Sequence, residues 1–249
     1  MTTPPRSEGA TPPVCGPPGP GVRLIETMRA EGGRVALLDR HLARLAASAD
    51  ALDYALDVAA VRRAAERAAG RGGVLRVRLT LGRGGDAEVQ ASPLGGGPFR
   101  TAWVDDLPLA EAGTWRTAHK TTDRDHYAAR RDRALARGAD EAVLINPDGA
   151  VTEGTRSTVW AERGGRLLTP PLRAGGLGGV FRAHVLATDP RAAEADLTPD
   201  DLRGSSAVLL TNAVRGWMPV RLVDGPPPRP REPPRDGGGG GADRVSARA

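Results

Sequence analysis

The chain of 249 residues contains a single lysine, Lys120, among its 35 Lys and Arg residues. Arginine stays protonated in proteins, whereas a lysine that is shielded from water can become a neutral amine. A neutral amine can form an imine with a carbonyl group. Lys120 stands in the polar run HKTTDR, directly before an expected helix. This setting favours a chemical role, although a surface lysine that escaped a bias toward arginine would fit the composition equally well.

Three further features have residue types that suit chemistry. Glu153 interrupts an apolar strand pattern in VTEG, so its carboxylate either points into a cleft or lies in solvent on an edge strand. The segment GGLGGVFR (175–182) precedes a predicted helix, where backbone N–H groups can approach a phosphate, and ordinary loop glycines are the alternative. Arg44 borders an apolar helix stripe, so it either reaches inward to an anion or stays solvated.

Together these features match the needs of one cofactor. An imine-forming amine, a phosphate-binding helix start, an arginine and a buried carboxylate are the groups that pyridoxal phosphate (PLP) requires, with the carboxylate keeping the ring nitrogen protonated. A cysteine-based metal cluster is not expected, because the one cysteine, Cys15, lies in the N-terminal tail. The four histidines are scattered and have no metal-ligand spacing.

Composition limits the other possibilities. Residues 1–20 and 225–249 are rich in Pro, Gly and charge and are predicted to be disordered tails. The net charge of +5 could indicate a nucleic-acid partner, but the arginines are mixed with 30 acidic residues and aromatic residues are scarce, so none is expected. No apolar run approaches the roughly 20 residues of a membrane span. With no signal peptide recognised, a cytoplasmic location and no membrane partner are expected.

Strands and helices alternate along the segments that must position these residues. In the first half we predict a hairpin (23–29 and 34–37), helices at 38–52 (capped by Asp39) and 58–69, and strands at 74–81, 87–93 and 100–104. In the second half we predict a helix that ends at Gly138, strands at 141–145, 150–162 and 205–211, and a helix after GGLGG. The pattern predicts an α+β fold with two lobes, 21–113 and 114–224, and a cleft between them.

Seven motifs resemble, in their order along the chain, the class IV (fold-type IV) PLP-dependent enzymes. They are LIETMR, LLDRHLARLAASADAL, HKTTDR..Y, DEAVLINPDGAVTEGTRST, LLTPPL, GLGGVFR and LLTNAVRGWMPV. The family contains branched-chain and D-amino-acid aminotransferases and 4-amino-4-deoxychorismate lyase, and HKTTDR..Y and NAVRGW most resemble the lyase. The resemblance spans about residues 23–222 and implies a homodimer whose cofactor cleft lies between two lobes.

The resemblance also implies roles for individual residues. Lys120 would be the Schiff-base lysine, Glu153 the partner of the ring nitrogen, and Arg44 a phosphate ligand. The remaining phosphate contacts that it implies are the backbone amides of Val180 and Phe181, together with Thr211 and Asn212.

Two positions depart from the family pattern. Phe181 stands where threonine is common, and Thr158 stands where asparagine is usual. Either change could weaken cofactor binding, but neither removes a catalytic group.

As a lyase, the chain would convert 4-amino-4-deoxychorismate into 4-aminobenzoate and pyruvate. This small-molecule substrate is a dianion, so cationic side chains should face it, and the candidates are Arg29, Arg78, Arg83 and Arg215. Tyr127 would pack beside the cofactor or begin the helix core. Two other functions stay open: an aminotransferase of the same fold that acts on branched-chain or D-amino acids, and a basic binding module without a cofactor. A non-catalytic member of the family is also conceivable.

Overall fold

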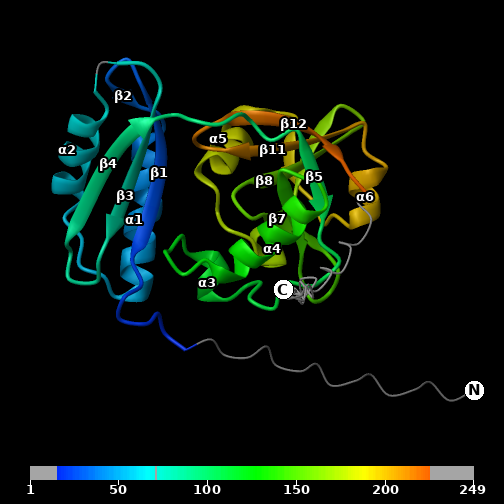
Figure 1. Ribbon diagram of the computed structural model, residues 1–249, viewed down its shortest axis with the longest axis horizontal. Coiled ribbons are helices and arrows are strands. Elements are labelled where there is room, and N and C mark those ends of the chain that lie inside the picture. Colours follow the sequence, from blue (N-terminus) through cyan, green and yellow to red (C-terminus); the bar gives the residue numbers. More distant parts are fainter. Residues whose placement is uncertain (1–15, 71, 225–249) are drawn as a thin grey trace, which may run out of the picture.

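The computed structural model describes residues 16–70 and 72–224, which form two parts that lie side by side (Figure 1). The predicted tail segments 1–15 and 225–249, including Cys15, lie outside the described residues. Residues 16–20 were predicted to belong to the disordered tail, yet Pro18 is buried and the carbonyl oxygen of Gly16 accepts a hydrogen bond from Trp115 Nε1 at 2.7 Å. The folded region therefore starts earlier than predicted, because this segment buries Pro18 and finds a hydrogen-bond donor.

The first part is a four-stranded antiparallel sheet with two helices against one face. Its strands, in the order β2-β1-β3-β4, are β1 (Leu24–Glu31), β2 (Arg34–Val35), β3 (Leu75–Leu81) and β4 (Ala87–Pro93). Its helices are α1 (Leu38–Leu52) and α2 (Val58–Ala68). The antiparallel pairing of β1 with β2 confirms the predicted hairpin, and both helices lie where the apolar periodicity predicted them.

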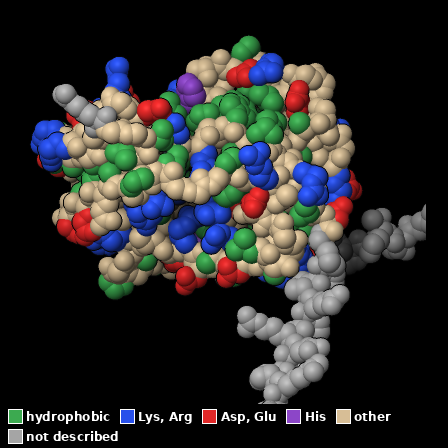
Figure 2. All heavy atoms as spheres, turned by 45° about the horizontal axis from the view of Figure 1, so that its top comes forward, with side chains coloured by type: hydrophobic (Ala, Val, Ile, Leu, Met, Phe, Trp, Pro, Cys, Tyr) green, Lys and Arg blue, Asp and Glu red, His purple; other side chains and the backbone are tan. Residues whose placement is uncertain are grey.

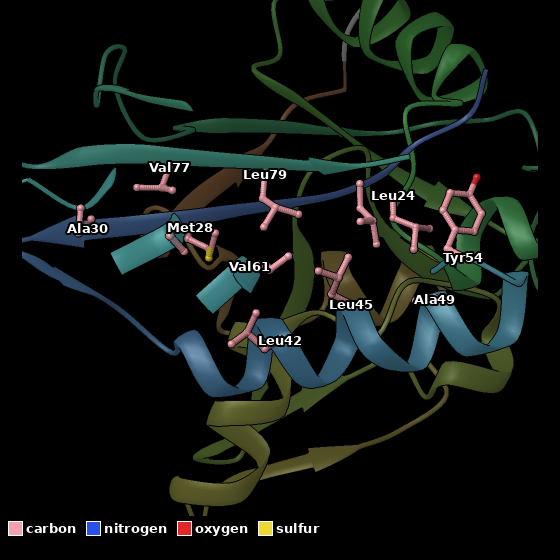
Figure 3. Packing of buried hydrophobic residues seen from close by; sticks show 13 residues of the cluster. Leu24, Met28, Ala30, Leu42, Leu45, Ala49, Tyr54, Val61, Val77 and Leu79 are labelled. Carbon is pink, nitrogen blue, oxygen red and sulfur yellow. The ribbon is translucent and has the colours of Figure 1, made fainter. Parts of the chain in front are cut away.

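Alternation along β1 and β3 gives the small sheet two different faces. Leu24, Met28, Val77 and Leu79 point toward the helices and pack against the apolar stripe of α1 (Figure 3). The residues between them, such as Thr27 and its cross-strand partner Arg78, point the other way, because successive side chains of a strand alternate between faces. The second face of the sheet therefore turns polar groups toward the other part of the molecule.

The predicted cap of α1 is wrong. Leu37 occupies the N-cap position with a left-handed backbone (φ 54°), and no side chain caps the helix there. Asp39 lies inside the first turn and forms an ion pair with Arg62 of α2. The carboxylate therefore links two helices, because a guanidinium lies within its reach on the neighbouring helix.

The second part is a curled eight-stranded sheet in the order β10-β9-β8-β11-β12-β5-β6-β7. The strands are β5 (Thr101–Val104), β6 (Glu141–Ile145), β7 (Val151–Gly154), β8 (Thr158–Arg163), β9 (Arg166–Thr169), β10 (Ala192–Glu194), β11 (Ala207–Asn212) and β12 (Gly216–Leu222). The helical segments are α3 (Trp115–Ala118), α4 (Asp125–Ala136), η1 (Leu172–Ala174), α5 (Val180–Thr188) and α6 (Pro199–Arg203). The α+β class is confirmed.

Two predictions about the second part are wrong. The strand at 100–104 was predicted in the first lobe, but β5 pairs in parallel with β6 and β12 of the large sheet. The strand predicted at 150–162 divides into β7 and β8, which lie at different positions in that sheet. The division occurs because the buried carboxylate of Glu141 binds the backbone N–H groups of Thr155 and Arg156 and turns the chain there.

In the described part of the chain, no helix is long and apolar enough to cross a membrane.

Replacing Leu45 of α1 by alanine should destabilise the protein. Leu45 is fully buried between α1 and the small sheet (Figure 3). The cavity and the lost apolar contact should lower the free energy of unfolding by about 3 kcal/mol, measured by urea denaturation. The matched control Leu135→Ala removes an exposed leucine, and should change this free energy by less than about 0.5 kcal/mol. Equal losses in the two variants would contradict the packing described here.

Candidate active site

A cavity of about 320 Å³ lies where the two parts of the molecule meet. The first part contributes residues of β1, α1 and β3 to the lining. The second part contributes the segment after α3, the β7–β8 turn, the start of α5 and the β11–β12 turn. Figure 2 shows Lys and Arg side chains gathered in the middle of the face where the two parts adjoin. The volume lies within the range of small-molecule and cofactor sites.

Lys120 lines this cavity, and its backbone segment is hydrogen-bonded to β1 of the first part. Its carbonyl oxygen accepts a hydrogen bond from the backbone N–H of Ile25 at 2.8 Å, and Thr122 N donates to the carbonyl of Arg23 at 2.9 Å. The preceding residue, His119, brings its Nδ1 to 3.0 Å from Ser48 Oγ of α1. These contacts fix the backbone of Lys120, so that its half-buried side chain enters the cavity from a defined direction.

The surroundings favour the neutral form of the Lys120 amine. Burial lowers the pKa of Lys120 to about 7, and the positive charges of Arg124 and Arg44 act in the same direction. The carboxylates of Glu26 and Glu153 oppose this shift. Because an ordinary lysine has a pKa near 10.4, this amine is available as a nucleophile or a base near neutral pH.

Glu153 lines the same cavity from β7, a strand whose four residues are all buried. Tyr127 of α4 donates a hydrogen bond from its hydroxyl to Glu153 Oε1 at 2.6 Å. Burial raises the pKa of Glu153 to about 7, although this hydrogen bond, the backbone N–H of Leu177 and the charges of Arg124 and Lys120 lower it. A cationic nitrogen held against this carboxylate would stabilise its ionised form further.

Arg124 and Tyr127 complete this wall of the cavity. The guanidinium of Arg124 lies 4.5 Å from the centre of the Tyr127 ring and donates to the carbonyl oxygen of Thr155. Tyr127 was predicted to pack beside the cofactor or to begin the helix core, and Arg124 was not predicted. Arg124 and Tyr127 follow Lys120 by four and seven residues, which places both at the beginning of α4. This spacing was the sequence signal that could have placed both residues near Lys120.

The start of α5 forms a second, anion-binding wall. The helix begins at Val180, and its first N–H groups have no carbonyl partner within the helix. A Cβ atom at Gly179 would lie only 2.8 Å from Thr158 Oγ1, and one at Gly176 would lie 3.3 Å from Glu153 Cβ. A side chain at Gly179 would therefore force Thr158 to shift, and one at Gly176 would crowd Glu153. The donors and the helix dipole together fit a phosphate group beside Lys120 and Glu153, as PLP would require.

Phe181 and Thr158, the two departures from the family pattern, have different consequences. The Phe181 ring packs edge-on to Trp217, with ring centres 6.0 Å apart, while its backbone stays in the first turn of α5. Thr158 is buried against Gly179 and keeps a hydroxyl in the lining of the cavity. Each position thus keeps a polar group, an amide or a hydroxyl, on the anion-binding side.

The other predicted phosphate contacts also line the cavity. Thr211 Oγ1 accepts a hydrogen bond from Trp160 Nε1 at 2.9 Å, which leaves its own hydroxyl proton for another acceptor. Asn212 Oδ1 accepts from the backbone N–H groups of Val214 and Arg215, so this side chain shapes the β11–β12 turn. Arg44 is bound to Glu26 and to the Gly178 carbonyl while also lining the cavity.

Two of the four arginines predicted to face a substrate lie in the lining, Arg78 and Arg215. Arg29 faces the same side of β1 as Thr27, but it lies outside the lining and pairs with Glu31. Arg83 donates to the carbonyl oxygens of Leu52 and Asp53 at the end of α1, away from the cavity. The structure brings further arginines to the lining that the sequence analysis missed, namely Arg76, Arg124, Arg156 and Arg182.

Comparison with known proteins agrees with this arrangement. The family model for class IV amino-transferases matches residues 23–223. A Schizosaccharomyces pombe protein with a provisional assignment as aminodeoxychorismate lyase is 32% identical over 200 residues, which cover 77% of this chain and 86% of that protein.

Two solved structures show similar folds. A hypothetical aminotransferase from Mycobacterium tuberculosis in its PLP-bound form is 28% identical with a TM-score of 0.72, and the match covers 85% of this chain and 84% of that chain. The 4-amino-4-deoxychorismate lyase from Pseudomonas aeruginosa is 26% identical with a TM-score of 0.66, and the match covers 84% and 86%.

Acetylation of Lys120 should reveal its lowered pKa. The acetylation rate at the Lys120 peptide of the cofactor-free protein, followed by mass spectrometry, should rise with pH and level off above a midpoint near pH 7, because only the neutral amine reacts. An ordinary lysine would keep gaining about tenfold in rate per pH unit up to pH 9. That continued rise would contradict the environment described for Lys120.

Proposed function

The chain belongs to the class IV aminotransferase family of PLP-dependent enzymes, and we propose that within it the chain is a 4-amino-4-deoxychorismate lyase. The similarity to a provisionally assigned lyase over most of both chains supports this proposal, as does the fold shared with the Pseudomonas aeruginosa lyase. The proposed reaction converts 4-amino-4-deoxychorismate into 4-aminobenzoate and pyruvate.

PLP would lie between the two walls of the cavity. We propose that Lys120 attaches to it, that Glu153 holds its ring nitrogen, and that Arg44, Thr211 and the amides of Val180 and Phe181 hold its phosphate. Asn212 would act by shaping the adjoining turn. When bound, the cofactor supplies an electron-accepting ring that acidifies the carbon bearing the substrate amine.

The charge of the cavity is the observation that carries the choice of substrate. Among the described residues, four arginines of the lining have no carboxylate partner within ion-pair distance: Arg76, Arg78, Arg124 and Arg215. Among the described residues that line the cavity, Glu153 is the only one with a carboxylate. Burial lowers the pKa of Arg78, and Arg76 and Arg124 lower it further, so an anion would relieve their mutual repulsion. A cofactor phosphate and a substrate with two carboxylates would supply this negative charge.

The residues of the chain suffice for the proton movements of this reaction. Once the substrate amine had displaced Lys120 from the cofactor, the freed neutral amine of Lys120 would remove the proton from the amine-bearing carbon of the substrate. The resulting ammonium is the natural donor of a proton to the departing enolpyruvyl group, which leaves as pyruvate. The remaining ring becomes aromatic, so this step is strongly favourable. The arginines would hold the carboxylates, and thereby the orientation of the substrate, during both steps.

An aminotransferase of the same fold is the second candidate. The similarity to the Mycobacterium tuberculosis aminotransferase favours it, and it would use Lys120 and Glu153 in the same first step. The two reactions differ in the destination of the proton, which an aminotransferase returns to a carbon of the cofactor. A branched-chain amino acid carries one carboxylate and an apolar side chain, which leaves more of the arginine cluster without a partner.

Product analysis should separate these two candidates. Purified protein is incubated with PLP and 4-amino-4-deoxychorismate, without any keto-acid acceptor, and should release pyruvate and 4-aminobenzoate. Lys120→Arg should reduce this rate at least about 1,000-fold, because a permanently charged side chain can neither attach to the cofactor nor take up the substrate proton. Robust amino transfer from an amino acid to 2-oxoglutarate, with no pyruvate released from 4-amino-4-deoxychorismate, would overturn the proposed lyase function.

Removing one arginine of the cluster should weaken substrate binding. Arg78→Gln should raise the KM for 4-amino-4-deoxychorismate about tenfold or more, because a charge-assisted hydrogen bond contributes about 1.5–3 kcal/mol. The matched control Arg83→Gln removes an arginine outside the cavity and should leave KM within about twofold of the wild-type value. An unchanged KM in Arg78→Gln would remove Arg78 from the substrate site.

A further inference from the structure

A second buried carboxylate lies close to the cavity but outside its lining. Glu26 of β1 points toward α1, on the opposite face of the strand from Ile25 and Thr27. Both Glu26 and its neighbour His41 are almost completely buried, with exposures of 2% and 0%. Burial of a carboxylate is costly unless its charge is compensated. The burial of Glu26 therefore requires partners that compensate its charge.

Arg44 and His41 provide that compensation. Arg44 Nε donates to Glu26 Oε1 at 2.8 Å and Arg44 Nη2 donates to Glu26 Oε2 at 2.6 Å, so the pair is bidentate. His41 Nδ1 lies 2.7 Å from the same Oε2. Although burial raises the pKa of Glu26, the charge of Arg44 and the hydrogen bonds of both neighbours bring it down to about 2. Glu26 is therefore ionised throughout the neutral pH range.

Held in this way, Arg44 connects the two parts of the molecule. Its Nη1 donates to the carbonyl oxygen of Gly178 at 3.1 Å, although the two residues are 134 positions apart in the chain. Gly178 precedes the N-terminus of α5 by two residues. One guanidinium thus joins β1 and α1 to the loop that sets the start of the anion-binding helix. Three of its five N–H bonds are used, and two stay available to an anion in the cavity that Arg44 lines.

We propose that Glu26 is a positioning residue for the phosphate side of the cavity. Its carboxylate fixes the guanidinium of Arg44, so that Arg44 keeps the Gly178 loop in place and offers its two free N–H bonds to a phosphate. An arginine without this partner would lose more side-chain freedom each time it bound an anion. The inference rests on the proposed PLP site, because it needs a phosphate at the start of α5, but it does not depend on which reaction follows.

Two ligands that differ only in the phosphate test this role. Cofactor-free protein is titrated with PLP and with pyridoxal, which lacks the phosphate, and binding is followed by absorbance. Glu26→Gln keeps the length of the side chain but removes its charge and one acceptor atom. Its dissociation constant for PLP should rise about tenfold, whereas its dissociation constant for pyridoxal should stay within about twofold of the wild-type value.

Glu31→Gln is the matched control, because it removes an exposed carboxylate from the same strand, and the ion-pair partner of Glu31, Arg29, lies outside the cavity. It should change neither dissociation constant. Should Glu26→Gln fail to fold, Glu26→Asp retains the charge but is too short for the bidentate contact, and the same selective loss of PLP affinity is expected. An unchanged PLP affinity in the folded variant, or equal losses for PLP and pyridoxal, would overturn the positioning role.

The same experiments separate this inference from the proposed function. If the wild-type protein binds PLP but catalyses only amino transfer, the lyase assignment fails while the titrations still test Glu26. If pyruvate is released as expected and Glu26→Gln binds PLP normally, only the role of Glu26 fails. A wild-type protein that does not bind PLP would contradict both.

Discussion

The site depends on the removal of water from one amine that is surrounded by positive charge. Lys120 stands near Arg124 and Arg44, and these charges together with burial favour its neutral form. The opposing carboxylates, Glu26 and Glu153, belong to different parts of the molecule, one to the small sheet and one to the large sheet. Neither carboxylate forms an ion pair with Lys120 among the described contacts, so the amine remains available for chemistry.

Each part of the molecule contributes what the other lacks. The small sheet supplies the arginines of β3 and fixes the backbone of Lys120 along β1, whereas the large sheet supplies Glu153 and the start of α5. Arg44 crosses between them by its bond to Gly178. The cavity therefore requires the two parts to keep a fixed relative position. A buried polar contact such as that between Arg44 and Gly178 specifies this position more narrowly than apolar packing does.

The sequence predicted the local elements and the reactive groups better than it predicted the arginine contacts. The leucine stripe of α1 and the single lysine stand out because periodicity and residue type suffice to recognise them. Arg78 and Arg83 look alike in sequence, yet Arg78 lies within β3 and lines the cavity, whereas Arg83 lies in the turn after β3 and binds the end of α1. Arg124, Arg76 and Glu26 were missed because their importance arises from neighbours distant in the chain. The turn between β7 and β8 was missed for the same reason, since Glu141 creates it.

Reduction with borohydride, followed by peptide mapping, tests the central claim most directly. The purified protein with PLP should show a visible absorption band that disappears on reduction, with the cofactor mass fixed on the peptide that contains Lys120. Lys120→Arg should show neither the band nor the labelled peptide, while its melting temperature stays near that of the cofactor-free wild type. A protein that stays colourless with excess PLP, or that carries the label at its N-terminal amine alone, would contradict the account.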